Sequence, residues 1–299
     1  MRIIRHPKRG KLHRPVVALG TFDGVHVGHK KVITGATKYA KKLKTHSAVI
    51  TFDPHPQEII APTRGLKLLT TLKEREELFC GLDADSVVVV KFSNHLKKLS
   101  CQQFVGRYLI GKLGVRAVFV GYDYAFGHGR SAGVGKLKKL GEKHGFAVKV
   151  IPPITVAGQI AKSGRIREFI SQGEFGKAVK MLGHAYRVTG KVVRGRGRGA
   201  ELGFPTANLR VDDRKLIPAQ GVYVGFVNKK KCVVNIGSRP TFGAGELLVE
   251  VHILGFTGSL RGKTIKVDLF ARLRDEQQFT DTGDLIRQIK KDIARARRM

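Results

Sequence analysis

Apolar positions in the first 160 residues alternate between short continuous runs and stretches with helical spacing. The runs are rich in Val, Ile and Phe, and they predict buried strands at residues 16–19, 47–52, 86–92, 116–121 and 147–151. Apolar residues at helical spacing predict helices after residue 30, over 71–82, after 100 and over 133–145. Because the strands are apolar on both faces and alternate with helices, we predict an α/β fold with a doubly wound parallel sheet.

The pattern changes after a helical segment at residues 165–183. The following segments are short and β-like, with Gly, Asn and Pro between them, and they lie at residues 186–193, 221–227, 231–237, 247–254 and 264–270. Such spacing predicts an all-β domain, either an antiparallel Greek-key-like barrel or a sandwich. Residues 282–298 complete the chain as a basic amphipathic helix. We therefore predict two domains, 1–183 and 184–299.

The composition and the apolar runs of the sequence indicate in which compartment the protein is expected. The 299 residues are 42% hydrophobic, which is enough for two cores. No apolar run is long enough to span a bilayer, and the basic first residues do not form a signal peptide. The cysteines are Cys80, Cys101 and Cys232, too far apart for a C-x-x-C motif. We expect a cytoplasmic protein with no membrane partner.

The net charge of +33 is the unusual bulk property. It is compatible with an anionic substrate such as a nucleotide, with a nucleic-acid surface, or with a generally basic exterior. The 56 Lys and Arg residues are spread over nearly every segment, which favours the last explanation. We expect no specific nucleic-acid partner, and the sequence leaves the oligomeric state open.

The stretch "GTFDGVHVGH" (20–29) carries the clearest chemistry. It joins the first strand to the first helix, where glycines allow close backbone approach and a helix N-terminus offers N–H groups to a phosphate. If the helix begins by His26, then His26 and His29 lie at the same end of it. Both rings could donate hydrogen bonds to phosphate oxygens that gain charge during transfer.

This H-x-G-H signature is shared by nucleotidylyltransferases, and the whole stretch closely resembles the adenylylating module of bacterial bifunctional riboflavin kinase/FAD synthetases. The resemblance implies a nucleotidylyltransferase-like sheet in which His26 and His29 are catalytic. It also implies a set of nucleotide contacts at Gly20, Thr21, Phe22, Asp23, Gly24 and Gly28. Two more segments, "TFDPHP" (51–56) and "GYDYAFGHGRSAG" (121–133), are similar to loops of this family. The flavin contacts that they imply are Asp53, His55, Asp123 and Phe126.

The segment "KSGRIR" (162–167) resembles the family's Ser-Ser-Thr-x-Ile-Arg motif near the nucleotide phosphates. By this resemblance, Ser163 and Arg167 contact the nucleotide. Lys162 and Gly164 replace a serine and a threonine of the motif, and a lysine at this place is itself able to meet a phosphate.

The second half has a signature of its own. "GRGRGAELGFPTANL" (195–209) resembles the riboflavin kinase module, which implies nucleotide contacts at Gly195, Gly197, Thr206 and Asn208 and magnesium ligands at Thr206 and Asn208. "NIGSRPTFG" (235–243) and "VEVHIL" (249–254) also match, and Glu250 is the implied base for the ribityl hydroxyl. "LRDEQQF" (273–279) resembles a segment near the flavin, where Arg274 and Phe279 are the implied contacts.

The resemblance thus implies two ATP-dependent reactions. Riboflavin would be phosphorylated to FMN in the C-terminal module, and FMN would be adenylylated to FAD in the N-terminal module with release of pyrophosphate. Magnesium would accompany ATP, and ATP, riboflavin and FMN would be the binding partners, with flavins as substrate and product.

Two alternatives stand beside this interpretation. The N-terminal module could transfer another nucleotide or use another acceptor, because H-x-G-H occurs in many nucleotidylyltransferases; the kinase motifs on the same chain argue against this. The chain could also be a nucleic-acid-binding protein, as its charge suggests. It lacks basic strands interleaved with aromatic residues and has no Trp, which argues against an RNA-stacking surface.

Overall fold

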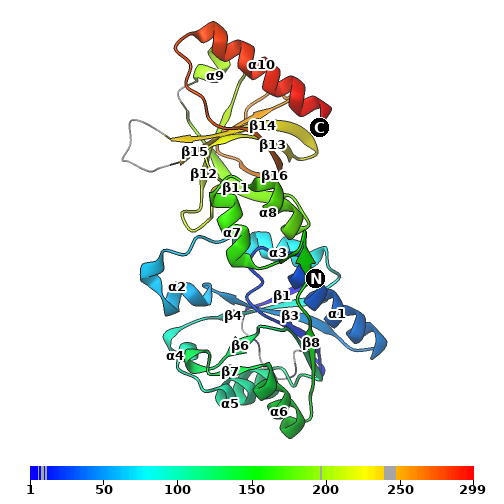
Figure 1. Cartoon of the computed structure of the whole chain (residues 1–299). Helices are drawn as coiled ribbons and strands as arrows, with labels where there is room; N and C mark the ends of the chain where they lie inside the picture. Colours follow the sequence, from blue (N-terminus) through cyan, green and yellow to red (C-terminus); the bar gives the residue numbers. More distant parts are fainter. Residues whose placement is uncertain (6, 8–9, 11, 196, 239–246) are drawn as a thin grey trace. The chain divides into compact units, whose positions relative to one another are not determined.

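A computed structural model of the chain describes residues 1–5, 7, 10, 12–195, 197–238 and 247–299. The chain forms two compact units, Met1–Lys162 and Ser163–Met299 (Figure 1). The second unit therefore includes the helical segment before residue 183, which the sequence pattern assigned to the first domain. Which activity that segment serves stays a prediction.

The first unit is built on a parallel sheet with the strand order β1-β4-β3-β2-β5-β8. Its strands are β1 (Arg2–Ile4), β2 (Val16–Leu19), β3 (Ser47–Asp53), β4 (Ser86–Lys91), β5 (Ala117–Gly121) and β8 (Ala147–Ile151). From β2 the chain continues to β3 and β4 on one side of it, and then to β5 and β8 on its other side. The direction of winding thus reverses beside β2, and the carboxyl end of a strand at such a switch point is where open α/β sheets bind ligands.

Helices cover both faces of this sheet, as predicted. Alternate residues of β2 serve opposite cores: Val16 and Ala18 pack in one apolar cluster with Ile33, and Val17 and Leu19 pack in another with Leu137. The first cluster includes residues of α1 (Val27–Lys42) and α3 (Leu72–Cys80). The second includes residues of α5 (Cys101–Phe104), the π-helical segment η2 (Val105–Lys112) and α6 (Val134–His144).

Several short elements fill the connections of the first unit. The helical ones are α2 (Pro56–Ile60), η1 (Pro62–Arg64), α4 (Asn94–Lys97) and η3 (His128–Arg130). Two small antiparallel ribbons pair β6 (Ala125–Phe126) with β7 (Ala132–Gly133) and β9 (Thr155–Val156) with β10 (Gln159–Ile160). The apolar pattern predicted none of these, nor the edge strand β1, because each is too short to show a period.

The second unit contains the predicted antiparallel barrel, closed in the order β11-β12-β15-β14-β13-β16. Its strands are β11 (Tyr186–Val193), β12 (Ala207–Val211), β13 (Gly221–Val227), β14 (Lys230–Ser238), β15 (Leu247–Ile253) and β16 (Thr264–Arg274). The sequence pattern missed β12, because the Pro-Thr-Ala-Asn stretch that begins it has no apolar alternation.

Helices complete the second unit: α7 (Ser163–Ser171), α8 (Phe175–Leu182), α9 (Arg198–Glu201) and α10 (Thr282–Arg298). The predicted helical segment 165–183 is thus two helices, which separate at Gly173, where φ is +78°. Phe175 of α8 packs edge-on against Tyr186 and Tyr223, with ring centroids 6.2 and 5.0 Å away. Ala296 of α10 packs in a small apolar cluster with residues of β13 and β16.

Two further features concern the setting of the chain. Across the described residues, no helix combines the length and the apolar character needed to cross a membrane. All three cysteines are free thiols, and burial raises the pKa of Cys232 to about 12.

Candidate active sites

The loop from Gly20 to His26 leaves the carboxyl end of β2 in a strained conformation. Phe22 and Val25 have φ values of +53° and +41°, and Gly24 has +83°. A positive φ costs a non-glycine residue about 1–3 kcal/mol and is rarest for a β-branched one. The side chains of Phe22 and Val25 are buried, so core packing stabilises this shape. Such over-determined loops are typical of ligand sites.

Asp23 shapes this loop from inside the protein. Its side chain is 1% exposed. Oδ2 accepts a hydrogen bond from the backbone N–H of Leu69 at 3.0 Å, and Oδ1 accepts from the N–H and hydroxyl of Thr70 at 2.8 and 2.9 Å. The Thr70 hydroxyl in turn accepts from the N–H of Gly24. Asp23 therefore fixes the loop to the segment before α3, and the nucleotide contact expected of it stays a prediction.

His26 and His29 are brought together at the start of α1, as predicted. His26 is the N-cap residue, and the two rings stack with centroids 3.6 Å apart and an interplanar angle of 23°. Phe22 contacts the ring of His29 edge-on at 5.3 Å. A Cβ at Gly28 would lie 3.1 Å from His26 Cε1, so the glycine between the histidines makes room for the stacked ring.

The N-cap also takes up backbone N–H groups at the start of α1. Nδ1 of His26 accepts hydrogen bonds from the N–H groups of Gly28 at 3.2 Å and His29 at 3.4 Å. Two of the N–H groups that the sequence analysis expected to be offered to a phosphate thus donate to the histidine itself, and a phosphate contact at this helix start stays a prediction. Since Nδ1 accepts, the neutral form of the His26 ring carries its proton on Nε2.

Arg75 is a residue that the sequence analysis missed. Its side chain is fully buried in α3, and Nη1 donates to the carbonyl of Thr21 at 2.8 Å, to the hydroxyl of Thr51 at 3.0 Å and to the carbonyl of Phe52 at 3.4 Å. Nη2 lies 4.0 Å from Asp53 Oδ1. Arg75 thus links the loop after β2 to the end of β3.

The environment of Arg75 balances its charge. Burial lowers the pKa of the guanidinium, and the charges of nearby carboxylates, foremost Asp23 and Asp53, oppose that shift. A sequence signal was available: Arg75 lies three residues after Leu72 and four before Phe79, which places it on the apolar face of α3. The surrounding "KEREE" has the local pattern of an exposed charged face, which hides this signal.

The second loop, after β3, holds Asp53 and His55. The Asp53 side chain is 36% exposed and so is open to a ligand. His55 is buried and caps α2: its Nδ1 accepts from the N–H of Gln57 at 3.1 Å, and its own N–H donates to Glu58 at 2.7 Å. This capping role accounts for the position of His55, and a flavin contact stays a prediction.

The third loop follows β5. Asp123 is exposed at the turn into β6. Phe126 is 7% exposed and packs in the core, stacked on Tyr124 with centroids 5.6 Å apart. Asp123 is therefore accessible to a ligand, whereas Phe126 is held within the core. Ser163 and Arg167 lie in α7, within the second unit.

The kinase motif residues gather around β12 and β15 of the barrel. Asn208 pairs in register with Glu250, and Glu250 pairs with Asn235 of β14. Residues opposite one another in a sheet point to the same face, so these side chains form a row across β12, β15 and β14. Val249 and Val251 point into the core, which directs Glu250 to the outer face, where it is half-buried.

The glycine-rich loop before β12 covers this row. Asn208 is 6% exposed although it faces outward. A Cβ at Gly195 would lie 2.1 Å from its amide nitrogen, and a Cβ at Gly199 would lie 3.0 Å from Thr206 Oγ1. The loop backbone therefore lies directly on Asn208 and beside Thr206. Gly197, with φ +80°, has open space around it.

The remaining predicted barrel residues lie near α10 or outside the described part of the chain. Arg274 at the end of β16 forms a bidentate ion pair with Asp292 of α10, with its Nε and Nη2 at 2.8 to 3.1 Å from the carboxylate. This contact ties α10 to the barrel, and a flavin contact by Arg274 stays a prediction. Phe279 is half-buried before α10. Of the matching segment 235–243, residues 239–243 lie outside the described residues.

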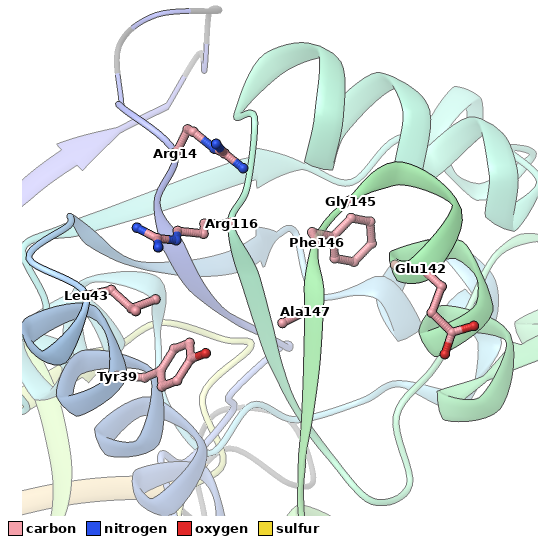
Figure 2. Close-up of a pocket in the computed structure, with 9 residues that line it drawn as sticks. Arg14, Tyr39, Leu43, Arg116, Glu142, Gly145, Phe146 and Ala147 are labelled. Atoms are coloured by element: carbon pink, nitrogen blue, oxygen red, sulfur yellow. The ribbon is translucent and has the colours of Figure 1, made fainter.

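A cavity of about 360 Å³ lies elsewhere in the first unit (Figure 2). It is lined by Tyr39 of α1 and Leu43 just after this helix, by Arg14 and Arg116 just before β2 and β5, and by residues of and after α6. The cavity lies at the amino ends of β2, β5 and β8, and the three loops described above leave the opposite, carboxyl edge of the sheet. The cavity contains none of the predicted site residues.

Comparisons with known proteins agree with the two motif sets. A family profile described as FAD synthetase matches residues 8–165, and one described as riboflavin kinase matches residues 182–299. A bifunctional riboflavin kinase/FMN adenylyltransferase from Listeria monocytogenes is 38% identical, over 93% of this chain and 90% of its own length. One from Escherichia coli is 33% identical, over 94% and 91%.

A solved structure is similar over the whole length. It is a Streptococcus pneumoniae chain described as a macrolide-efflux protein, with a TM-score of 0.89 and 28% identity, and all of each chain is covered. Both profiles match in the order of the two motif sets, and the curated relatives span nearly the whole sequence. The chain therefore belongs to the family of bifunctional riboflavin kinase/FMN adenylyltransferases.

Proposed function

We propose that the chain converts riboflavin to FMN in its barrel unit and FMN to FAD at the carboxyl edge of its parallel sheet. The observation that carries the proposal is the stacked pair of His26 and His29, held at the switch point of the sheet between Phe22 and the Gly28 backbone. The barrel carries a second and separate cluster of Thr206, Asn208 and Glu250.

In the adenylylation step, an oxygen of the FMN phosphate attacks the α-phosphorus of ATP. The bond from that phosphorus to the bridging oxygen breaks, and pyrophosphate leaves with the electron pair. Nε2–H of His26 and the ring of His29 donate hydrogen bonds to the α-phosphate oxygens as charge grows on them. The backbone contacts of His26 Nδ1 fix the tautomer that makes this possible. Asp53, Asp123, Ser163 and Arg167 complete the binding of the two substrates.

In the kinase step, Glu250 accepts the proton of the ribityl hydroxyl that attacks the γ-phosphate of a second ATP. Thr206 and Asn208 would hold magnesium, which supplies charge neutralisation on the phosphates. Their neutral oxygens are the hard donors that magnesium prefers, and the glycine-rich loop, the segment that we propose binds the ATP phosphates, lies on Asn208 and beside Thr206. Riboflavin and ATP are thus proposed as the ligands of the barrel.

The free cysteines fit a reducing compartment, so we place the enzyme in the cytoplasm. We also keep the adenylylation function for residues 1–183 and the kinase function for residues 184–299. This division assigns α7 and α8 to adenylylation by function, although they pack with the barrel unit.

Chromatography of flavins after incubation with ATP and magnesium tests the proposal. The parent protein should turn riboflavin into FMN and then FAD. Glu250→Gln should fail to phosphorylate riboflavin but should still make FAD when FMN is supplied. His29→Ala should accumulate FMN and make FAD about 10²–10³-fold more slowly, the usual effect of losing a charge-stabilising donor.

The two variants serve as controls for each other, because each leaves one activity intact and so reports that the chain is folded. If neither flavin is converted by the parent protein, the proposed function is wrong. If Glu250→Gln phosphorylates riboflavin normally, the base lies elsewhere in the barrel.

A further inference from the structure

The cavity at the amino edge of the parallel sheet (Figure 2) is lined by residues that neither proposed activity uses. Its volume of about 360 Å³ is within the range of about 300–1,000 Å³ that is usual for small-molecule sites. The loops that carry the adenylylation motifs leave the opposite edge of the sheet. The proposed functions therefore leave this cavity without a role, and the chemistry of its lining indicates which class of ligand fits it.

Two arginines line the cavity at the starts of neighbouring strands. Arg14 lies just before β2 and Arg116 just before β5, and these strands pair in parallel. Both residues are exposed, so their charged groups are open to a ligand from solvent. Among the residues that the structure describes, neither guanidinium takes part in an ion pair or a hydrogen bond. Each thus presents a planar set of N–H donors, which matches the oxygens of a phosphate.

Hydrogen bonds fix the backbone of both arginines. The Thr45 hydroxyl donates to the carbonyl of Arg14 at 3.1 Å. The N–H of Arg116 donates to the carbonyl of Pro15 at 2.9 Å, and its own carbonyl accepts from the N–H of Ala147 at 3.1 Å. Arg14 has a φ of +39°, a value that a non-glycine residue rarely adopts. Because the backbone is held in place, only the two side chains have to be ordered when a ligand binds.

The remaining walls of the cavity are largely apolar. Tyr39 of α1 and Leu43 just after it are half-buried, and Phe146 after α6 is buried. The Tyr39 ring packs against Phe119 with the centroids 5.6 Å apart, and the Lys149 ammonium lies 5.8 Å from the centroid of the same ring. These walls offer contacts to an apolar or planar group joined to the anion, a group that inorganic phosphate lacks.

The electrostatic setting favours the arginine side of the cavity. The carboxyl ends of α1 and α6 lie at the cavity, and their partial negative charge disfavours an anion. Lysines in the last turns, Lys42 in α1 and Lys143 in α6, offset that charge. Within the described part of the chain, Glu142 is the one acidic residue in the lining, and Figure 2 shows its carboxylate on the side away from the two arginines. The arginine side thus remains positive.

We propose that this cavity is a second ligand site, and that its ligand is an organic phosphate monoester. Arg14 and Arg116 bind the phosphate, which is largely dianionic at neutral pH. Tyr39, Leu43 and Phe146 contact the apolar or planar part of the ligand. The site lies at the opposite edge of the sheet from the stacked histidines, so it goes beyond both proposed reactions.

Binding of phenyl phosphate to the full chain tests the site, because this probe joins a phosphate monoester to a ring. In amide NMR spectra at constant ionic strength, the signals of Leu43 and Ala147 should shift and saturate. Arg14→Gln and Arg116→Gln should each weaken this binding about tenfold or more, the effect of losing one charge-assisted contact. Lys138→Gln removes a charge from α6 outside the cavity lining and should change binding by no more than about twofold.

Two further variants and a second probe separate the phosphate contact from the apolar contact. Glu142→Gln removes the carboxylate of the lining and should tighten binding of phenyl phosphate about twofold. Inorganic phosphate, which has no ring to bury, should bind at the same amides about tenfold more weakly than phenyl phosphate. Leu43→Ala should weaken the binding of phenyl phosphate and leave that of inorganic phosphate unchanged. The same spectra report whether each variant is folded.

Three results would overturn the site. If the Leu43 and Ala147 signals do not saturate, or if Lys138→Gln weakens binding as much as the arginine variants do, only the general positive charge attracts the probe. If the shifts are confined to Gly24 and Gly28, the phosphate binds at the histidine turn alone. If a single-stranded oligonucleotide shifts the cavity amides at lower concentration than phenyl phosphate, this edge is a nucleic-acid surface instead. None of these measurements requires turnover, so failure of the proposed activities is a separate result.

Discussion

Replacing Asp23 by asparagine tests whether this residue acts on the fold or on the nucleotide. The buried carboxylate accepts three hydrogen bonds from Leu69 and Thr70, at 2.8 to 3.0 Å. An amide has a single acceptor oxygen, so in either orientation its NH₂ group faces a buried donor. A hydrogen bond to a charged group contributes about 1.5–3 kcal/mol, and an unsatisfied buried N–H costs about 1–3 kcal/mol.

We therefore expect Asp23→Asn to lower the free energy of unfolding of the first unit by about 2–4 kcal/mol. For a unit of this size, about 2–4 °C of melting temperature corresponds to each kcal/mol, so the transition should fall by about 5–15 °C. Scanning calorimetry is the suitable measurement, because it can separate the transitions of the two units.

The exposed carboxylate of Asp123 gives the matched control, since Asp123→Asn should shift the same transition by no more than about 0.5 kcal/mol. At a temperature below its transition, Asp23→Asn should retain riboflavin phosphorylation, which belongs to the barrel. A variant that melts like the parent protein but no longer makes FAD would show that Asp23 contacts the substrate and that its contacts with the loop are unimportant.

Two further predictions concern the barrel. Gly195→Ala places a methyl group 2.1 Å from the built position of the Asn208 amide nitrogen, so it should displace Asn208 and reduce riboflavin phosphorylation at least about tenfold, with FAD synthesis from FMN unchanged; a kinase rate equal to the parent's would contradict the close approach. Arg274→Met leaves Asp292, 7% exposed, without its ion-pair partner, and should destabilise the barrel transition by about 3 kcal/mol in calorimetry. A raised KM for riboflavin with unchanged melting would instead support a flavin contact at Arg274.

The longer strands of both units, except β12, could be predicted from the sequence, because a buried strand must present apolar side chains whatever else it does. The parallel, doubly wound character of the sheet followed from their alternation with helices, whereas the order of the strands did not. β12 was not predicted because its first residues, Ala207 and Asn208, show no apolar alternation; Asn208 instead contacts the loop backbone at Gly195. The compact units divide after Lys162, ahead of the predicted domain boundary at residue 183, because a helix pattern such as that of residues 165–183 shows that a face is buried and not which unit buries it. The functional boundary stays a prediction.

The candidate sites were predictable where chemistry is local in sequence. His26 and His29 stack because residues three positions apart at the start of a helix lie on the same side of it. Contacts between residues that are far apart in the sequence produce no such local pattern. Asp23 meets Thr70, 47 residues later, and Arg75 reaches back to Thr21 across 54 residues. A buried arginine in a run of charged residues has the same local pattern as an exposed one, so its role emerged only with its partners.

The compact units divide after Lys162, whereas the adenylylation motif of residues 162–167 continues into α7. This difference affects how the chain can be cut in two. A polypeptide cut after Lys162 would keep the sheet whole but would lose Ser163 and Arg167. One cut after Gly183 would keep them but would strip Phe175 from Tyr186 and Tyr223, leaving these aromatic faces open to water. If Ser163 and Arg167 bind the nucleotide as proposed, no single cut of the chain leaves both an adenylylating unit with these contacts and a barrel unit with its aromatic residues covered. On that proposal, gene fission would have to duplicate the α7–α8 hairpin, so that each daughter protein inherits a copy.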